Sequence, residues 1–280
     1  MTKALFGFPR ATSAYTLSGG SWNSFYPVTN LQVLPLSRVA RSTNAVLTST
    51  IIDGTTATPQ TAGMIALVRH NLSSAATIRL TCWTTSARTT TSFVGAFESI
   101  WPAGFTAPNP TERANAIWTW FKRFSAAGSV GVTVGAWRIE INDTTNADGF
   151  VQAGFVEIAQ VYETTYNFQW GFQYGFEWRS QATLAIGGAE YIDRRQKPRV
   201  ASGAFPVTLR NEAMTKFYEM QRQLDMSVPV LFVPLPDETA HLPRTVMLAR
   251  QTDPGKITMV TRAAGSLMDN VPFALREIIG

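Results

Sequence analysis

The chain has 280 residues, of which 45% are apolar and 15% charged, and its formal net charge is +5. A typical soluble domain has about 25% charged residues, so this composition argues against intrinsic disorder and against a highly charged solubility module. The length suffices for two domains with a core each, and the basic residues form no dense run that would favour nucleic acid as a partner.

The cysteine count and the start of the chain indicate the cellular compartment. Cys82 is the single cysteine, which excludes intrachain disulfides and a Cys-rich zinc site. The opening sequence MTKALFGFPR has an apolar stretch of about five residues, shorter than the roughly 7–15 of a signal peptide. No window approaches the roughly 18 apolar residues of a membrane span. We therefore expect synthesis in a reducing cytoplasm, no membrane insertion and no export by the general route.

Up to about residue 165, turn residues separate short apolar stretches roughly every ten positions, which is typical of an antiparallel sandwich or barrel. Trp137, Ile139 and Ile141 alternate with polar residues, so one face of that strand is expected to be buried. The turn residues 146–149, followed by an apolar run, predict a hairpin with that strand as its first arm. The predicted strands are Ala45–Ile52, Gly63–Val68, Ala76–Trp83, Ser129–Val134, Ala136–Ile141 and Phe150–Val161.

Among these strands lies the segment 111–124, TERANAIWTWFKRF, which has the polarity of a helix. Glu112 stands near its start, and Lys122 and Arg123 stand near its end, as a helix dipole favours. We interpret it as a short helix or a loop plug over one end of the sandwich.

The segment 166–178 has an aromatic ring at every second residue. A period of two cannot form a helical stripe, but it places all the rings on one side of an extended strand. Either this is a linker and a strand packed under the next domain, or it is an arm that another subunit covers. With the basic cluster after it, the candidate subunit interface is Phe168, Trp170, Phe172, Tyr174, Phe176, Trp178, Arg194 and Arg195.

The remainder of the chain mixes strands with one amphipathic helix, predicted over Asn211–Asp225. Further strands are predicted over Val228–Val233, Thr245–Ala249 and Lys256–Thr261. The fold class is thus mainly β, with an N-terminal antiparallel β-sandwich over 1–165 and a smaller α+β domain with one helix over 166–280.

The residue pattern contains no catalytic motif. His70 and His241 have no nucleophile motif beside them, and the glycine pairs at 19–20 and 187–188 predict turns rather than a phosphate loop. Glu140 and Glu157 are the candidates for a glycosidase pair, but the alternation places Glu140 on a solvated face. We expect no catalytic residue, metal or cofactor, and a protein that is not an enzyme.

The loop residues 143–148 offer oxygen ligands for calcium through Asp143, Asn146 and Asp148. Their spacing matches no EF-hand, and the turn-forming tendency of Asn and Asp explains them equally well.

A sugar site needs an exposed aromatic face and hydrogen-bonding side chains beside it. The loop-like segments of the first part supply both kinds of residue, although core packing explains at least half of them. The candidate glycan contacts are Trp22, Tyr26, Arg69, His70, Asn71 and Trp101.

Three stretches of the first part resemble the galactose-binding-like, or discoidin-like, β-sandwich. SGGSWNSFYPVTNLQ, GMIALVRHNLSSAATIRLTCW and AWRIEINDTTNADGFVQAGFVEI resemble that family's loop, core strand pair and final hairpin. The resemblance implies a jelly-roll sandwich that binds sugars or serves as an adhesive module.

The whole chain resembles structural proteins at the tail tip of long-tailed bacteriophages, most specifically in IDRRQKPRVASGAFPVTLRNEAMTKFYEMQRQLDMSVPVLFVPLPD. This implies a virion baseplate or distal tail protein, made in the host bacterial cytoplasm. Its implied partners are other copies of itself in a ring, the tail tube and the baseplate hub. The alternative function is a carbohydrate-binding adhesion module that contacts host surface glycan.

Overall fold

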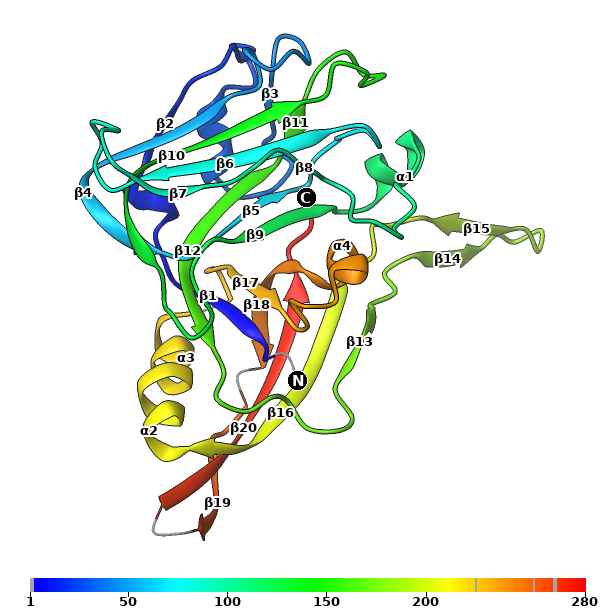
Figure 1. Ribbon diagram of the computed structural model, residues 1–280. Helices are drawn as coiled ribbons and strands as arrows, with labels where there is room; N and C mark the ends of the chain where they lie inside the picture. The colour runs from blue at the N-terminus through cyan, green and yellow to red at the C-terminus, as the bar shows by residue number, and fades with distance from the viewer. Residues whose placement is uncertain (1–2, 225, 254, 264–265) are drawn as a thin grey trace. The chain divides into compact units, whose positions relative to one another are not determined.

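The computed structural model describes residues 3–224, 226–253, 255–263 and 266–280, which form two compact units (Figure 1). Unit 1 holds residues 3–165, Val230–Leu248 and Gly280, and unit 2 holds Tyr166–Pro229 and Ala249–Ile279. Val230–Leu248 was expected in the second domain. It belongs to unit 1 because its strand pairs with the first strand of the chain.

Unit 1 is a sandwich of two antiparallel sheets, so the expected N-terminal β-sandwich is confirmed. The first sheet runs in the order β17 (Val230–Val233), β1 (Leu5–Arg10), β12 (Phe155–Glu163), β5 (Met64–Val68) and β9 (Thr119–Arg123). The second runs in the order β2 (Thr16–Ser18), β4 (Ile52–Ala62), β10 (Val132–Asn142), β6 (Thr77–Trp83) and β7 (Thr91–Val94), with β8 (Glu98–Ser99) also paired to β6.

Strand β10 shows how the sequence pattern becomes structure. Trp137, Ile139 and Ile141 are fully buried, while Arg138 and Glu140 between them are partly exposed, as the alternation predicts. Trp137 pairs with Gly54 of β4, and its ring lies against that glycine. A Cβ atom at residue 54 would stand 2.2 Å from Cε2 of the indole, so the glycine makes room for the largest buried side chain.

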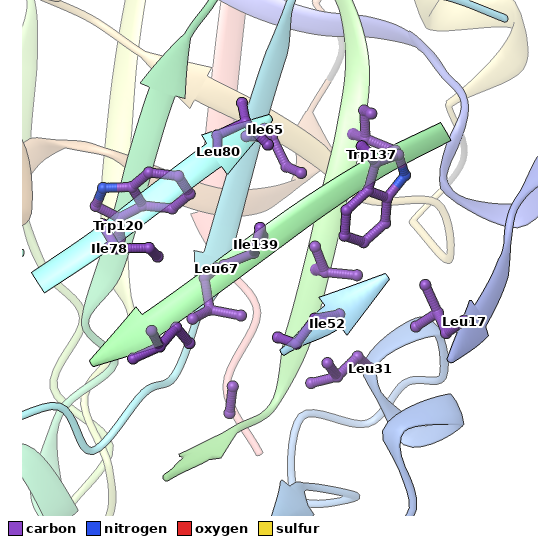
Figure 2. Close-up of a cluster of buried hydrophobic side chains, with 14 of the residues drawn as sticks. Leu17, Leu31, Ile52, Ile65, Leu67, Ile78, Leu80, Trp120, Trp137 and Ile139 are labelled. Carbon is purple, nitrogen blue, oxygen red and sulfur yellow. The ribbon is translucent and has the colours of Figure 1, made fainter. Parts of the chain in front are cut away.

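The core of unit 1 forms where side chains of both sheets meet, as Figure 2 shows. Ile65, Leu67 and Trp120 come from one sheet, and Leu80 and Trp137 come from the other. The interdigitation of two apolar inner faces is the main source of stability in a sandwich.

The predicted hairpin over residues 137–161 is wrong. Strand β10 pairs with β4 and β6, whereas β12 pairs with β1 and β5, so the turn at 146–149 connects the two sheets. Residues 45–50, predicted as strand, form a loop that precedes β4. Both errors arise because local alternation reports a buried face but not the identity of the partner strand.

The segment 111–124, predicted as a short helix or a loop plug, forms a helix only at its start. Helix α1 spans Pro110–Asn115, where Asn109 and Glu112 form a capping box, and it ends before Ile117. The chain then forms β9, in which Trp120 pairs with Leu67 of β5 and is buried. Sheet pairing therefore overrides the helical charge pattern at the apolar end of the segment.

Short elements complete unit 1. β3 (Ala40–Arg41) and β11 (Gln152–Ala153) form a two-stranded ribbon, and α4 spans Leu242–Thr245. The 3₁₀ helices are Thr12–Ala14, Val28–Gln32 and Thr239–His241. Within the described ranges, no helix has the length and hydropathy needed to cross a membrane.

Unit 2 is a sheet with one helical segment, as the predicted α+β part requires. Its strands include β13 (Gln173–Phe176), β16 (Arg199–Leu209), β20 (Ser266–Glu277) and β19 (Thr258–Ala263); β18 (Met247–Asp253) starts in unit 1 and continues into unit 2. β14 (Gln181–Leu184) and β15 (Glu190–Asp193) form a separate hairpin.

The helical segment consists of α2 (Arg210–Glu212), a π-helical stretch over Ala213–Tyr218 and α3 (Glu219–Gln223). The predicted cap at Asn211 lies inside the helix instead, because the helix begins directly after Leu209. The buried face of the segment presents Phe217 and Met220.

The aromatic segment 166–178 is not one long strand. The chain turns at Trp170 and Gly171, where Gly171 has φ of 95°, and only Gln173–Phe176 pairs into the sheet. Phe168 and Phe172 stack with a centroid distance of 4.1 Å, and Phe168 contacts Phe205. Half-buried Phe168 and Phe172 thus belong to the packing of unit 2, while Tyr166, Trp170, Tyr174, Phe176 and Trp178 remain exposed.

Candidate functional site

Several loops of unit 1 lie side by side around the β3–β11 ribbon (Figure 1). The backbone N–H of Asn23 donates to the carbonyl of Arg41 at 2.9 Å, and that of Ser42 donates to the carbonyl of Val151 at 2.9 Å. The N–H of Asn71 donates to the carbonyl of Gln152 at 3.2 Å. Four segments that are far apart in the sequence are therefore held as one surface.

Arg41 is the centre of this surface. Its guanidinium carbon lies 4.7 Å from the Tyr26 ring centroid and 4.2 Å from the Phe150 ring centroid. Nε and Nη2 donate to Oε1 of Gln152 at 3.2 and 2.8 Å. Two cation–π contacts and a forked hydrogen bond fix the guanidinium plane.

Asn71 connects the surface to the loop that comes after β10. Its Oδ1 accepts from the N–H of Gln152 at 2.7 Å, and its Nδ2 donates to the carbonyl of Phe150 at 3.0 Å and to Asp148 at 2.8 Å. The Asn71 side chain thereby holds the loop in place, and the Asp148 carboxylate is exposed beside it.

Phe25 adds the most exposed ring of unit 1, with 85% of its surface accessible. The side chain of Asn23 accepts from the N–H of Phe25 at 2.9 Å, which fixes the turn that presents Phe25 and Tyr26. Trp22 is turned inward instead, because its indole N–H donates to the carbonyl of Ile51 at 3.2 Å. The name end-loop surface denotes the set Phe25, Tyr26, Arg41, Asn71, Phe150 and Gln152.

His70 and Trp101 were expected to contact glycan, and both lie in the interior of unit 1. Their rings pack with centroids 5.5 Å apart, and Trp101 Nε1 donates to the carbonyl of Ser73 at 2.8 Å. Burial of His70, together with the charge of Arg113, lowers the pKa of the imidazole to about 3. His70 is therefore a neutral packing residue at any physiological pH.

Arg69, the remaining glycan candidate, is half-buried with φ of 58°, and its Nη1 finds no hydrogen-bond partner among the described residues. Burial lowers the pKa of its guanidinium. Of the six expected residues, Tyr26 and Asn71 are the two that lie in the end-loop surface.

The two carboxylates considered as a catalytic pair lie in different sheets. Glu140 of β10 forms an ion pair with Arg79 at 2.6 Å. Glu157 of β12 is fully buried and receives two hydrogen bonds from Arg10, at 2.9 and 2.8 Å. Burial raises the pKa of Glu157, while the Arg10 hydrogen bonds act in the opposite direction. Each carboxylate is explained by its own ion pair.

Asp143, considered for calcium, is a buried acceptor of protein hydrogen bonds. Its Oδ2 accepts from the N–H of Ser73 at 2.9 Å and from Nδ2 of Asn146 at 2.8 Å, and its Oδ1 accepts from the Ser73 hydroxyl. In the part of the chain that the structure describes, no three His, Cys, Asp or Glu side chains gather as metal ligands.

Sequence reasoning did not find Phe25, Arg41, Phe150 or Gln152. The turn residues Ser and Asn in SWNSFYP are the available signal for Phe25, because they mark a turn that exposes the side chains directly after it. Arg41 gives no such signal, since Gln152 lies 111 positions away in the sequence.

No protein-family model matches the chain, and no curated protein matches it. Among solved structures, the chain is similar to the family 32 CBM, a carbohydrate-binding module, of Clostridium perfringens NanJ in complex with galactose. The identity is 11%, the match covers 55% of this chain and 98% of that one, and the TM-score is 0.38.

A second similar structure is CBM32-1 from a family 31 glycoside hydrolase of Clostridium perfringens, with 12% identity over 52% of this chain and 93% of that one, and a TM-score of 0.33. A third is the CBM32 of AlyQ in complex with 4,5-unsaturated mannuronic acid, with 12% identity over 51% of this chain and 92% of that one, and a TM-score of 0.32. Likenesses this distant carry no argument about the ligand of this chain.

Proposed function

We propose that unit 1 binds carbohydrate through the end-loop surface. The observation that carries this proposal is an exposed aromatic turn, Phe25 and Tyr26, joined to a guanidinium that is fixed by two rings and an amide. Aromatic faces accept the apolar C–H face of a pyranose ring, and planar amide and guanidinium groups bond its hydroxyls.

The rigidity of the surface favours binding over catalysis. Arg41 is held by Tyr26, Phe150 and Gln152, so little side-chain entropy is lost when a ligand binds. The nearby carboxylate, Asp148, bonds to Asn71. The groups of this surface can donate, accept and stack, and they offer no paired acid and base for bond cleavage.

The experiment is a glycan array with the full chain, followed by titration of each retained glycan. Phe25→Ala and Arg41→Ala should each weaken binding about tenfold or more, a loss on the scale of a lost ring or charged contact. Phe97→Ala is the matched control, because Phe97 is an exposed phenylalanine of unit 1 that also lies under an arginine, Arg79, at 4.5 Å.

Binding that survives both substitutions, or that Phe97→Ala weakens equally, would remove the end-loop surface as the site. A wild-type chain that retains no glycan would remove the function itself.

A second candidate function is that of a structural subunit at the tail tip of a tailed bacteriophage. The exposed rings of unit 2 favour it, because a subunit buried among neighbours needs apolar surface that a monomer would not display. Gold-labelled antibodies against this chain should mark the tail tips of particles released from cells that carry its gene. Particles without label, or without the chain in their peptide digest, would contradict this role.

A further inference from the structure

The β14–β15 hairpin of unit 2 has no covering within the described residues. Every residue of both strands is exposed, and Figure 1 shows the hairpin extending away from β13 and β16 of the same unit. Leu184 is 73% exposed and Ile186, at the tip, is fully exposed. Two-stranded hairpins are marginally stable in water, so a hairpin with apolar side chains requires a surface to pack against.

The pairing register places the apolar side chains of the hairpin together. Ala182 pairs with Ile192, and Leu184 pairs with Glu190, so these four side chains share one face, whereas Tyr191 pairs with Thr183 on the other face. Three of the four side chains on this face are apolar, which is typical of a face that is buried.

Exposed rings lead up to the hairpin along the chain. Trp170 is fully exposed and Trp178 is 76% exposed, although Lys197 Nζ lies 3.9 Å from the centroid of the latter ring. The name arm surface denotes the set Trp170, Tyr174, Phe176, Trp178, Leu184, Ile186 and Ile192.

We propose that the arm surface is an interface between two copies of this chain. Its four aromatic side chains alone offer on the order of 600 Å² of apolar area, and a stable interface buries about 800 Å² per partner. With its three aliphatic side chains added, the arm surface is therefore large enough for a stable dimer.

The charges and strand edges of unit 2 also fit a second copy. Asp193 already forms an ion pair with Arg195 of the same chain at 2.8 Å. Glu190 stands on the hairpin strand that leads into Arg194, so a twofold axis can bring Glu190 of one copy to Arg194 of the other. β13 is the last strand of its sheet, and an open edge can accept an antiparallel strand of a like chain. Phe168 and Phe172 contribute by packing under this region rather than by facing the partner.

The test is the molar mass of the full chain from about 1 to 100 µM, measured by light scattering during size-exclusion chromatography and by sedimentation velocity. The wild type should be a dimer or a larger closed assembly at the upper concentrations. Leu184→Asp combined with Ile192→Asp should raise the dissociation constant at least a hundredfold, because each substitution places a charge in a buried apolar contact.

Val94→Asp is the matched control, since Val94 is an apolar strand residue of unit 1 that is 63% exposed. This variant should associate like the wild type, and circular dichroism should be the same for all three proteins. A wild type that stays monomeric at 100 µM overturns the proposal, as does a double variant that still associates. A monomer that sediments with phosphatidylglycerol vesicles would assign the arm surface to a membrane instead. Because the arm surface lies in unit 2, none of these outcomes affects the glycan proposal for unit 1.

Discussion

The two units differ in how far they bury tryptophan side chains. In unit 1, Trp101, Trp120 and Trp137 are almost fully enclosed, and each lies against side chains of the sandwich. In unit 2, Trp170 and Trp178 are largely exposed. Both units are rich in aromatic residues, so the contrast lies in what surrounds the rings and not in the composition.

Unit 1 covers most of its apolar side chains with its own residues, whereas unit 2 leaves apolar side chains that a partner could cover. Unit 1 has two sheets whose inner faces cover each other. Hydrogen bonds such as those of the Asn71 and Asp143 side chains hold its polar loops in place. In unit 2, the sheet that contains β16 and β20 and the helical segment cover Phe205, Phe217 and Phe273 but leave the arm surface open. The first region is therefore expected to govern stability and the second to govern association.

The largest expected effect is that of Trp137→Ala in unit 1. Trp137 is fully buried and fills the space left by Gly54, so its truncation should lower the free energy of unfolding by about 3–5 kcal/mol. Urea unfolding followed by circular dichroism measures this loss. A loss below about 1 kcal/mol would mean that the core of unit 1 closes around the cavity and is not tightly packed.

The next effect is acid sensitivity caused by His70. Its folded pKa of about 3 lies below the value of about 6.5 in an unfolded chain, so below pH 6.5 the unfolded state binds a proton that the folded state does not. Stability should therefore fall as the pH falls, by about 3 kcal/mol between pH 7 and pH 4 from this residue alone. His70→Gln should remove that part of the slope, as measured by urea unfolding at several pH values.

His241→Gln is the control for the acid experiment, because His241 lies near the surface of unit 1 and close to Arg244. This variant should keep the wild-type slope between pH 7 and pH 4. If His70→Gln also keeps it, the buried imidazole is protonated in the folded state, and the interior around Trp101 admits water or a counterion.

Much of the fold could be predicted because its signals are local. The alternation in β10 identified the buried Trp137, and β5 and β6 lie within a residue of their predicted bounds. The pairing of β10 with β4 and β6 could not be predicted, because several antiparallel partners satisfy the same alternation. The helical charge pattern of 111–124 failed for a related reason, since the partner strand β5 is distant in the sequence.

The candidate site was less predictable than the fold. Tyr26 and Asn71 were proposed from residue type and loop context, which also selected the buried His70 and Trp101. Arg41 joins Tyr26 to Gln152 only because a ribbon of two residues per strand brings their loops together. Contacts of this kind depend on tertiary pairing and leave no periodic trace in the sequence.

The smallest expected effect is that of Trp170→Ala in unit 2, which makes the same substitution as Trp137→Ala in the opposite environment. At about 1 µM, where copies should be separate, the free energy of unfolding should change by no more than about 0.5 kcal/mol, because the fully exposed ring loses no packing. At 100 µM the wild type should gain stability from association and the variant should gain less, since a partner that binds only the folded state stabilises it by mass action. A loss above about 1.5 kcal/mol at the lowest concentration would place Trp170 in the chain's own core and remove the difference between the two units.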